Sequence, residues 1–131
     1  MHLQHFNINF FSLYVDGHQV PSTALQPSFR DNTDYVRSYM QMQSAVGTAF
    51  RDDDSGISYY GFGHGLTVFV FDLTADLANS EHSEPTKRGS LRAEVRFAEQ
   101  LPTAVTCFAH AEYDNCIEIN QDRNILLDYL I

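Results

Sequence analysis

Short stretches in which apolar and polar residues alternate run through most of the sequence, and they determine the expected class of fold. In the clearest one, between Leu91 and Phe97, apolar residues alternate with Arg92, Glu94 and Arg96. Because side chains along a strand point to opposite faces in turn, this stretch has one face for a core and one for water. Similar β-rich stretches follow at 103–113, 117–119 and 125–129. Short strands separated by turns predict a mainly β protein, an antiparallel jelly-roll-like β-sandwich.

The first alternating stretch changes phase part of the way along. Its apolar residues fall first at even and then at odd positions, in the order Phe6, Ile8, Phe10, Phe11, Leu13 and Val15. One extra residue in a strand produces such a change, so we expect a long strand with a bulge at Phe10-Phe11. Asp16-Gly17 then predicts a turn, Val20-Pro21 an edge or exit, and residues 21–31 an extended loop.

One segment has a helical period instead. Between residues 33 and 46, apolar residues recur at steps of three and four, which predicts the one helix of the fold. Asn32 or Thr33 is the expected N-cap, Asp34 lies in the first turn, and Gly47 ends the helix. We interpret its Met and Tyr stripe as a surface that faces the core.

The middle of the chain predicts turns, one buried strand and an exposed loop. Residues 51–56 are typical of a turn, and the glycine-rich residues 61–65 of a flexible lead into a strand. The nearly continuous apolar run at 66–73 suits a strand buried on both faces. The polar residues 79–90 predict an exposed loop.

Length and charge restrict the organisation and the partners. A chain of 131 residues predicts a single domain spanning residues 1–131. Eight Lys and Arg against seventeen Asp and Glu give a net charge of −9, which argues against nucleic acid and against anionic membranes as partners. With no secretory signal and no apolar run of about 18 residues, we expect a soluble protein with reduced thiols.

The acidic run Asp52–Asp54 is the obvious candidate for a metal site, because hard cations prefer carboxylate oxygens. It does not match a calcium-binding EF-hand loop: with Gly56 as the sixth position, the first ligand position falls on Arg51. We interpret the run as a solvated turn, with calcium held by several loops as the alternative.

No set of residues predicts catalysis. His64, between two glycines, could act as a general base only with a carboxylate or nucleophile nearby. The glycines at 61–65 lack phosphate-loop spacing, and Ser90 lacks the GxSxG pattern. Cys107 and Cys116 form no CxxC pair and are expected to be buried or half-buried structural thiols. The sequence therefore predicts no catalytic residue, cofactor or metal ligand, and a protein that is not an enzyme.

A series of strand and turn motifs carries a family resemblance. In order, they are the strand start at 87–91, the break at Pro102, the turn at 111–115, the Ile-Glu-Ile step at 117–119 and the closing segment at 123–125. The series resembles the C-terminal end of double jelly-roll major capsid proteins of large DNA viruses and of Polinton (Maverick) and adintovirus elements. Leu13 to Gly17 with Val20-Pro21, residues 35–47 and residues 65–73 extend the resemblance upstream.

The resemblance implies a structural capsid protein, whose family forms pseudo-hexagonal trimers and has no catalytic residues to carry over. Family members have two jelly rolls, and this chain can hold at most the second. Our expected strands number about six or seven, against eight in a full jelly roll. Missing strands leave open edges, so we expect association with itself or with other capsid proteins, with exchange of the Leu3–Val15 segment as one route. The expected location is the virion, or the cell interior for a virus-derived host copy.

Two other functions remain open. In a β-sandwich binding module, the loops at 51–65 and 79–90 would hold a carbohydrate, a peptide or a calcium ion. The residues to watch in that case are Tyr59, Tyr60, Phe62 and His64. A small β-fold enzyme centred on His64 would need a carboxylate or a Cys within hydrogen-bond reach of the imidazole.

Overall fold

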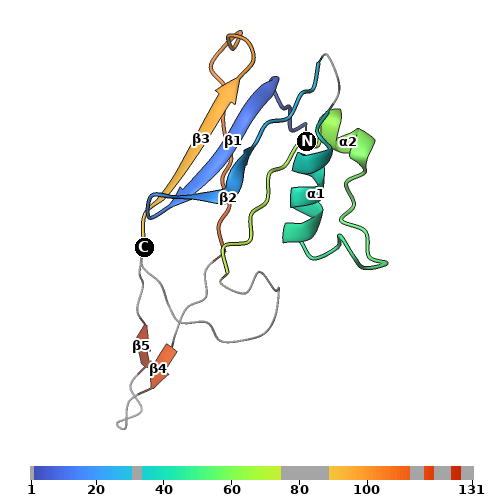
Figure 1. The fold of residues 1–131 in the computed structure, drawn as a ribbon. Coiled ribbons are helices and arrows are strands. Elements are labelled where there is room, and N and C mark those ends of the chain that lie inside the picture. The colour runs from blue at the N-terminus through green and yellow to red at the C-terminus, as the bar shows by residue number, and fades with distance from the viewer. Residues whose placement is uncertain (1, 31–33, 75–88, 113–116, 120–124, 128–131) are drawn as a thin grey trace.

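The computed structural model describes residues 2–30, 34–74, 89–112, 117–119 and 125–127 (Figure 1). Five strands and two short helices make up its regular structure. In chain order they are β1 (Ile8–Val15), β2 (His18–Leu25), α1 (Val36–Ala45), α2 (Tyr59–Gly63), β3 (Leu91–Phe97), β4 (Ile117–Ile119) and β5 (Ile125–Leu127). The predicted mainly β class is confirmed: the protein is a small β-sandwich-like domain with an antiparallel sheet and a small amount of helix.

The main sheet has three antiparallel strands in the order β2-β1-β3, so the first strand lies in the centre. Figure 1 shows β1 between its two neighbours, with both helices on the β2 side. The predicted bulge is present: the register of β1 shifts between Ile8 and Phe10 against β3, and between Phe11 and Leu13 against β2. The change of phase therefore falls at Asn9 on the β3 side, close to the predicted Phe10-Phe11.

The turn between β1 and β2 lies at Asp16-Gly17, as predicted, and both residues have positive φ, 50° and 80°. Strand β2 then continues through Pro21 to Leu25, so the loop predicted from residue 21 is wrong for its first five positions. A proline is tolerated there because β2 is an edge strand, where one side of the backbone has no ladder to maintain.

The predicted helix is present as α1 but begins later than expected. Its N-cap is Tyr35, so Asp34 precedes the helix and the prediction that it lies in the first turn is wrong. The predicted caps Asn32 and Thr33 lie outside the described residues. Gly47 ends the helix as expected, with φ of 78° and its N–H donating to the Ser44 carbonyl at 3.0 Å.

The second helix, α2, was not predicted from the sequence, which favoured a flexible lead-in for the same glycines. Ser58 caps it, since its hydroxyl accepts from the Gly61 N–H at 3.0 Å. Gly63 packs against the ring of Tyr35, and a Cβ there would lie 2.5 Å from the ring carbon Cζ. This glycine therefore serves close packing rather than flexibility.

The strand predicted at 66–73 is wrong. Only an isolated parallel bridge between Leu3 and Leu66 forms there, and residues 67–71 are half-buried rather than buried on both faces. The segment crosses the sheet instead of joining it: the rings of Phe69 and Phe71 stack on Phe11 of β1, with centroids 4.5 and 5.4 Å apart. Its apolar run is used for ring contacts with the sheet face.

The core lies between the sheet and the helices. Tyr35, Met42 and Phe62 are its most buried cluster, and partly buried side chains surround them: Phe29, Tyr39, Ile57, Phe69 and Val70. The core-facing interpretation of the helical stripe is confirmed for Met42, which is 2% exposed, whereas Met40 is 43% exposed. Leu13 and Leu25 extend the buried apolar region into β1 and β2.

The C-terminal third matches the prediction only in part. Strand β3 has the predicted bounds of the alternating stretch, and β4 and β5 form an antiparallel pair in which Ile117 lies opposite Leu127. The strand predicted at 103–113 is wrong for residues 103–112, which form no ladder, and Tyr113 lies outside the described residues. Because that segment is extended and mostly exposed, Cys107 is exposed and not the buried thiol we expected. Cys116 lies outside the described residues.

Candidate functional site

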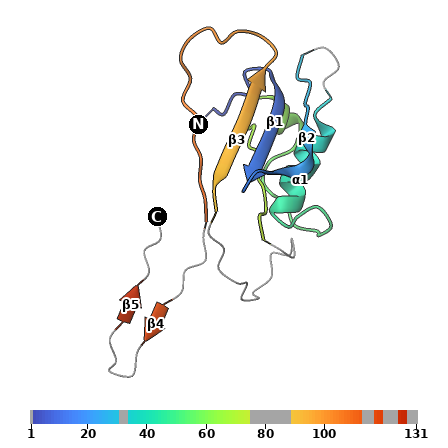
Figure 2. The same cartoon turned by 60° about the vertical axis from the view of Figure 1, so that its left-hand side comes forward.

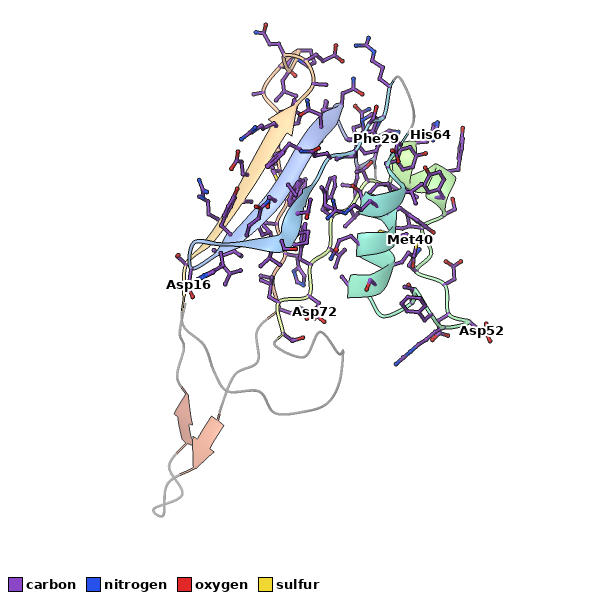
Figure 3. All side chains as sticks on the ribbon, in the orientation of Figure 1. Asp16, Phe29, Met40, Asp52, His64 and Asp72 are labelled. Atoms are coloured by element: carbon purple, nitrogen blue, oxygen red, sulfur yellow. The ribbon has the colours of Figure 1, made fainter. Side chains whose placement is uncertain are left out.

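A cavity of about 690 Å³ opens where the N-terminal segment, the end of α2 and the loop after β3 meet. The Leu3 N–H donates to the Gly65 carbonyl at 2.8 Å, which holds the N-terminal segment beside that loop. Polar side chains line much of the cavity: His2, Gln4, His5, Asn7, His64, Glu99 and Gln100. Figure 3 labels His64 at the end of the molecule where α2 lies.

His5 is held firmly on the wall of this cavity. Its Nδ1 accepts from the Asn7 N–H at 2.9 Å, and its ring stacks on Phe29 with centroids 4.0 Å apart. Burial lowers the pKa of His5, and His64 lowers it further, against a hydrogen bond with the Gly63 backbone that raises it. Because Nδ1 acts as an acceptor, the imidazole is neutral in this arrangement.

Glu99 joins three segments beside the same cavity. It accepts from Asn7 Nδ2 at 2.5 Å and forms an ion pair with Arg30 at 2.9 Å. The Asn7 hydrogen bond and then the Arg30 charge hold the pKa of this carboxyl below its usual range. Glu99 is therefore a structural anion that ties the loop after β3 to the N-terminal segment.

His64 does not meet the requirement set for a general base. Its Nδ1 lies 2.8 Å from the Tyr60 carbonyl, and its ring stacks on Tyr60 with centroids 3.8 Å apart. In the part of the chain that the structure describes, no carboxylate or thiol hydrogen-bonds to His64. Glu99 lines the same cavity but bonds to Asn7 and Arg30. Among the described residues, His64 therefore lacks the orienting carboxylate or thiol that a general base would need.

The four residues predicted for a binding module separate in the structure. Phe62 is fully buried in the core, and Tyr59 stacks on Tyr35 with centroids 4.5 Å apart. Tyr60 is 69% exposed, and among the four only His64 lines the cavity. Of the predicted loop at 79–90, only Gly89 and Ser90 are described, and both are exposed. Neither the binding-module hypothesis nor the enzyme hypothesis included His5, Asn7 or Glu99, because their proximity depends on long-range contacts.

The acidic run at 52–54 is exposed, as the solvated-turn interpretation requires. Asp54 Oδ1 accepts from the Gly56 N–H at 3.0 Å, which closes the turn locally. Figure 3 shows Asp52 on the loop after α1. Among the described residues, no three His, Cys, Asp or Glu side chains come together in a set that could hold a metal ion.

The sheet has a second polar feature, on the face opposite Phe11. There the guanidinium of Arg92 lies over the ring of Tyr14 at 4.3 Å, and that of Arg96 lies over Phe10 at 4.4 Å. Glu94 lies between the two arginines and accepts from Arg96 Nε at 2.9 Å. This hydrogen bond is the main reason why the pKa of Glu94 is lowered. We call this surface of β1 and β3 the arginine face.

The two edges of the sheet differ. Along β2, the side chain of Arg37 donates to the carbonyls of Thr23 and Ala24 at 2.8 and 3.2 Å and so covers part of that edge. Along β3, the backbone pairs with β1 on one side, and no described residue pairs with it on the other. Figure 2 shows β3 at the outer side of the sheet.

Comparisons with known proteins do not place the chain in a family. No family model matches it, and no solved structure matches it. It is similar to an uncharacterized protein of Caenorhabditis elegans, with 21% identity over 118 residues. The match covers 88% of this chain and 28% of the nematode protein, so the chain spans less than a third of that relative's length. Among the described residues, no helix is long and apolar enough to cross a membrane.

Proposed function

We propose that this chain is a structural subunit that assembles through the edge of its β-sheet, of the virus-derived capsid type that its motifs resemble. The observation that carries the proposal is the outer edge of β3, which pairs with no described residue, whereas Arg37 partly covers the opposite edge of the sheet at β2. An uncovered edge strand presents unpaired N–H and C=O groups in a row, and these groups pair readily with another chain.

Exposed apolar side chains support the same function. Phe50 is 95% exposed and Phe108 is 82% exposed, and Leu91 at the start of β3 is 52% exposed. Large apolar side chains that a single chain leaves in water gain free energy when a partner covers them. The expected partners are further copies of the chain or other capsid proteins, in a virion or inside a cell.

Some of the strand positions behind the resemblance support the proposal. Gly89-Ser90 directly precedes β3, Ile117–Ile119 forms β4, and β5 begins at Ile125. These positions agree with the expected strand starts, whereas the strand expected before the turn at 111–115 is absent from residues 103–112. This agreement supports the proposal through secondary structure alone.

Size-exclusion chromatography with light scattering, over about 1–100 μM protein, tests the proposal. We expect oligomers whose share grows with concentration, and ordered particles or sheets by negative-stain electron microscopy at the upper end. A strict monomer across the range would overturn the assembly function.

A second function, small-ligand binding, is favoured by the cavity. Its volume of about 690 Å³ lies in the range typical of ligand pockets, about 300–1,000 Å³. Its lining mixes hydrogen-bonding side chains with apolar Phe6, Leu101 and Pro102, which suits a hydroxyl-rich ligand such as a carbohydrate, in place of the loop site expected from the sequence. NMR shift mapping with mono- and disaccharides should then perturb His5, Asn7 and Gln100. A His64→Ala variant should weaken binding, and His110→Ala, which alters an exposed histidine away from the cavity lining, should not.

A further inference from the structure

The direction of the backbone groups along β3 shows which residues face the open edge. The Asp16 N–H donates to the Ser90 carbonyl at 3.0 Å, and the Ala98 N–H donates to the Asn7 carbonyl at 2.8 Å. In an antiparallel ladder the backbone groups of successive residues point to opposite sides. The even-numbered residues of β3 therefore face β1, and the N–H and C=O groups of its odd-numbered residues point outward: Leu91, Ala93, Val95 and Phe97.

The side chains of β3 divide between the two faces of the sheet in the same alternation. Arg92, Glu94 and Arg96 lie on the arginine face, where two of them cover rings of β1. The apolar side chains of β3 lie on the other face of the sheet, which we call the Phe11 face. On that face Ala93 is opposite Leu13, and Val95 is opposite Phe11. Leu91 and Ala93 are exposed there. The edge therefore offers charge on one side and uncovered apolar surface on the other.

We propose that the β3 edge pairs with β3 of a second copy, antiparallel about a two-fold axis at Ala93, so that two three-stranded sheets become one. This inference rests on the proposed assembly function and adds the partner and the register. Ala93 would then face Ala93 of the second copy through two backbone hydrogen bonds. Leu91 would lie beside the second copy's Val95, which covers apolar surface that the single chain exposes.

Charge distinguishes this register from its neighbours. With the axis at Ala93, Arg92 of each copy faces Glu94 of the other in a pair without backbone hydrogen bonds, where side chains are closest. With the axis at Glu94, the two Glu94 carboxylates would face each other and Arg92 would face Arg96, so like charges would repel. With the axis at Val95, Glu94 would face Arg96, so the new pair would repeat one that each chain already forms at 2.9 Å. With the axis at Ala93, Glu94 instead faces Arg92, which lies over the Tyr14 ring and forms no ion pair among the described residues.

A proline substitution tests the edge without breaking the sheet. Because the Ala93 N–H points away from β1, Ala93→Pro removes no hydrogen bond of the β1–β3 ladder but removes two across the proposed axis. We expect the dissociation constant of the dimer to rise tenfold or more, measured by light scattering or analytical ultracentrifugation. Circular dichroism and thermal melting of the variant check that the monomer still folds.

Disulfide trapping tests the register independently of the proline. In a Cys107→Ser, Cys116→Ser background, Ala93→Cys should form a covalent dimer on mild oxidation, because facing Cα atoms about 5.5 Å apart are within disulfide range. Val95→Cys and Glu94→Cys are the matched controls for the other two axes and should cross-link much more slowly. Faster cross-linking of either control would overturn the register.

The outcomes separate this inference from the function on which it rests. A strict wild-type monomer would remove both. Wild-type oligomers that survive Ala93→Pro, with no cross-link through Ala93→Cys, would overturn the β3 pairing and leave assembly by another surface standing. Loss of the dimer with the proline, together with selective cross-linking at position 93, would support it.

Discussion

The carboxylate of Asp16 accepts a hydrogen bond from the Ser90 N–H at 2.8 Å, across 74 positions of sequence. It thereby ties the turn between β1 and β2 to the start of β3. The preceding Gly89 leaves room for this contact, because a Cβ there would lie 2.7 Å from the carboxyl carbon of Asp16. The Gly-Ser strand start therefore has a packing reason that does not depend on any family resemblance.

Asp16→Ala should destabilise the fold by about 1–2 kcal/mol, since it removes the acceptor for the Ser90 N–H and places Ala at a φ of 50°. Asp16→Asn keeps a side-chain oxygen and tolerates positive φ, so it should cost less. Urea unfolding of the two variants checks this order. Equal stability of Asp16→Ala and the wild type would show that the contact contributes nothing.

Phe62→Ala should destabilise the fold by about 3–5 kcal/mol, because the side chain is fully buried among aromatic rings and its removal leaves a cavity. Phe50→Ala is the matched control: the same truncation at a residue 95% exposed should change stability by less than about 0.5 kcal/mol. Thermal melting of both variants measures the difference. Similar losses at the two positions would contradict this placement of the core.

Arg37→Met should destabilise the fold by about 1 kcal/mol, because it keeps the aliphatic stem but removes both donors to the carbonyls of Thr23 and Ala24. It also uncovers the β2 edge, so we expect more self-association by light scattering. Arg51→Met, at an exposed position in the loop after α1, is the control. Unchanged stability and unchanged association would mean that Arg37 does not protect this edge.

Stability should fall as the pH drops through the mildly acidic range, in part because of His5. Its pKa is lowered in the folded state, so between that pKa and about 6.5 the unfolded chain binds more protons than the folded chain. The stabilisation is therefore complete above about pH 6.5 and is lost as the pH falls toward the folded-state pKa. Urea midpoints at pH 7.5 and 5.5 should differ more for the wild type than for His5→Gln. A His5→Gln profile parallel to that of the wild type would contradict this role.

Local sequence patterns correctly predicted the elements that depend least on contacts with distant parts of the chain. The alternation at 91–97, the turn at Asp16-Gly17 and the helical period after residue 35 each act over a few residues, and all three are confirmed. The run at 66–73 misled, because its Phe residues are buried against Phe11 by ring stacking, without a ladder. An apolar run indicates burial and leaves the kind of partner undetermined.

The candidate site was harder to predict for the same reason. The cavity brings Asn7 and Glu99 together across 92 positions, and neither residue lies in a recognisable motif. His64 stood out because glycines flank it, but those glycines serve the packing of α2 and of His2 beside Gly65. Phe6 and Asn7 both have positive φ values, which mark a tight change of direction beside the cavity. This feature is visible in the folded backbone and not in the sequence.

The bulge in β1 keeps the apolar side chains of both halves of the strand on the same face of the sheet. Ile8 lies opposite Phe97 and Leu13 opposite Ala93, on one face, although their numbers differ in parity, because Asn9 takes up the odd step. Regular alternation through all of these residues, without the bulge, would place Leu13 and Val15 on the opposite face from Ile8, and one half of the strand would turn its apolar side chains to water. Deleting Asn9 would remove the odd step itself, so the shortened strand would keep Ile8, Leu13 and Val15 on one face without a bulge.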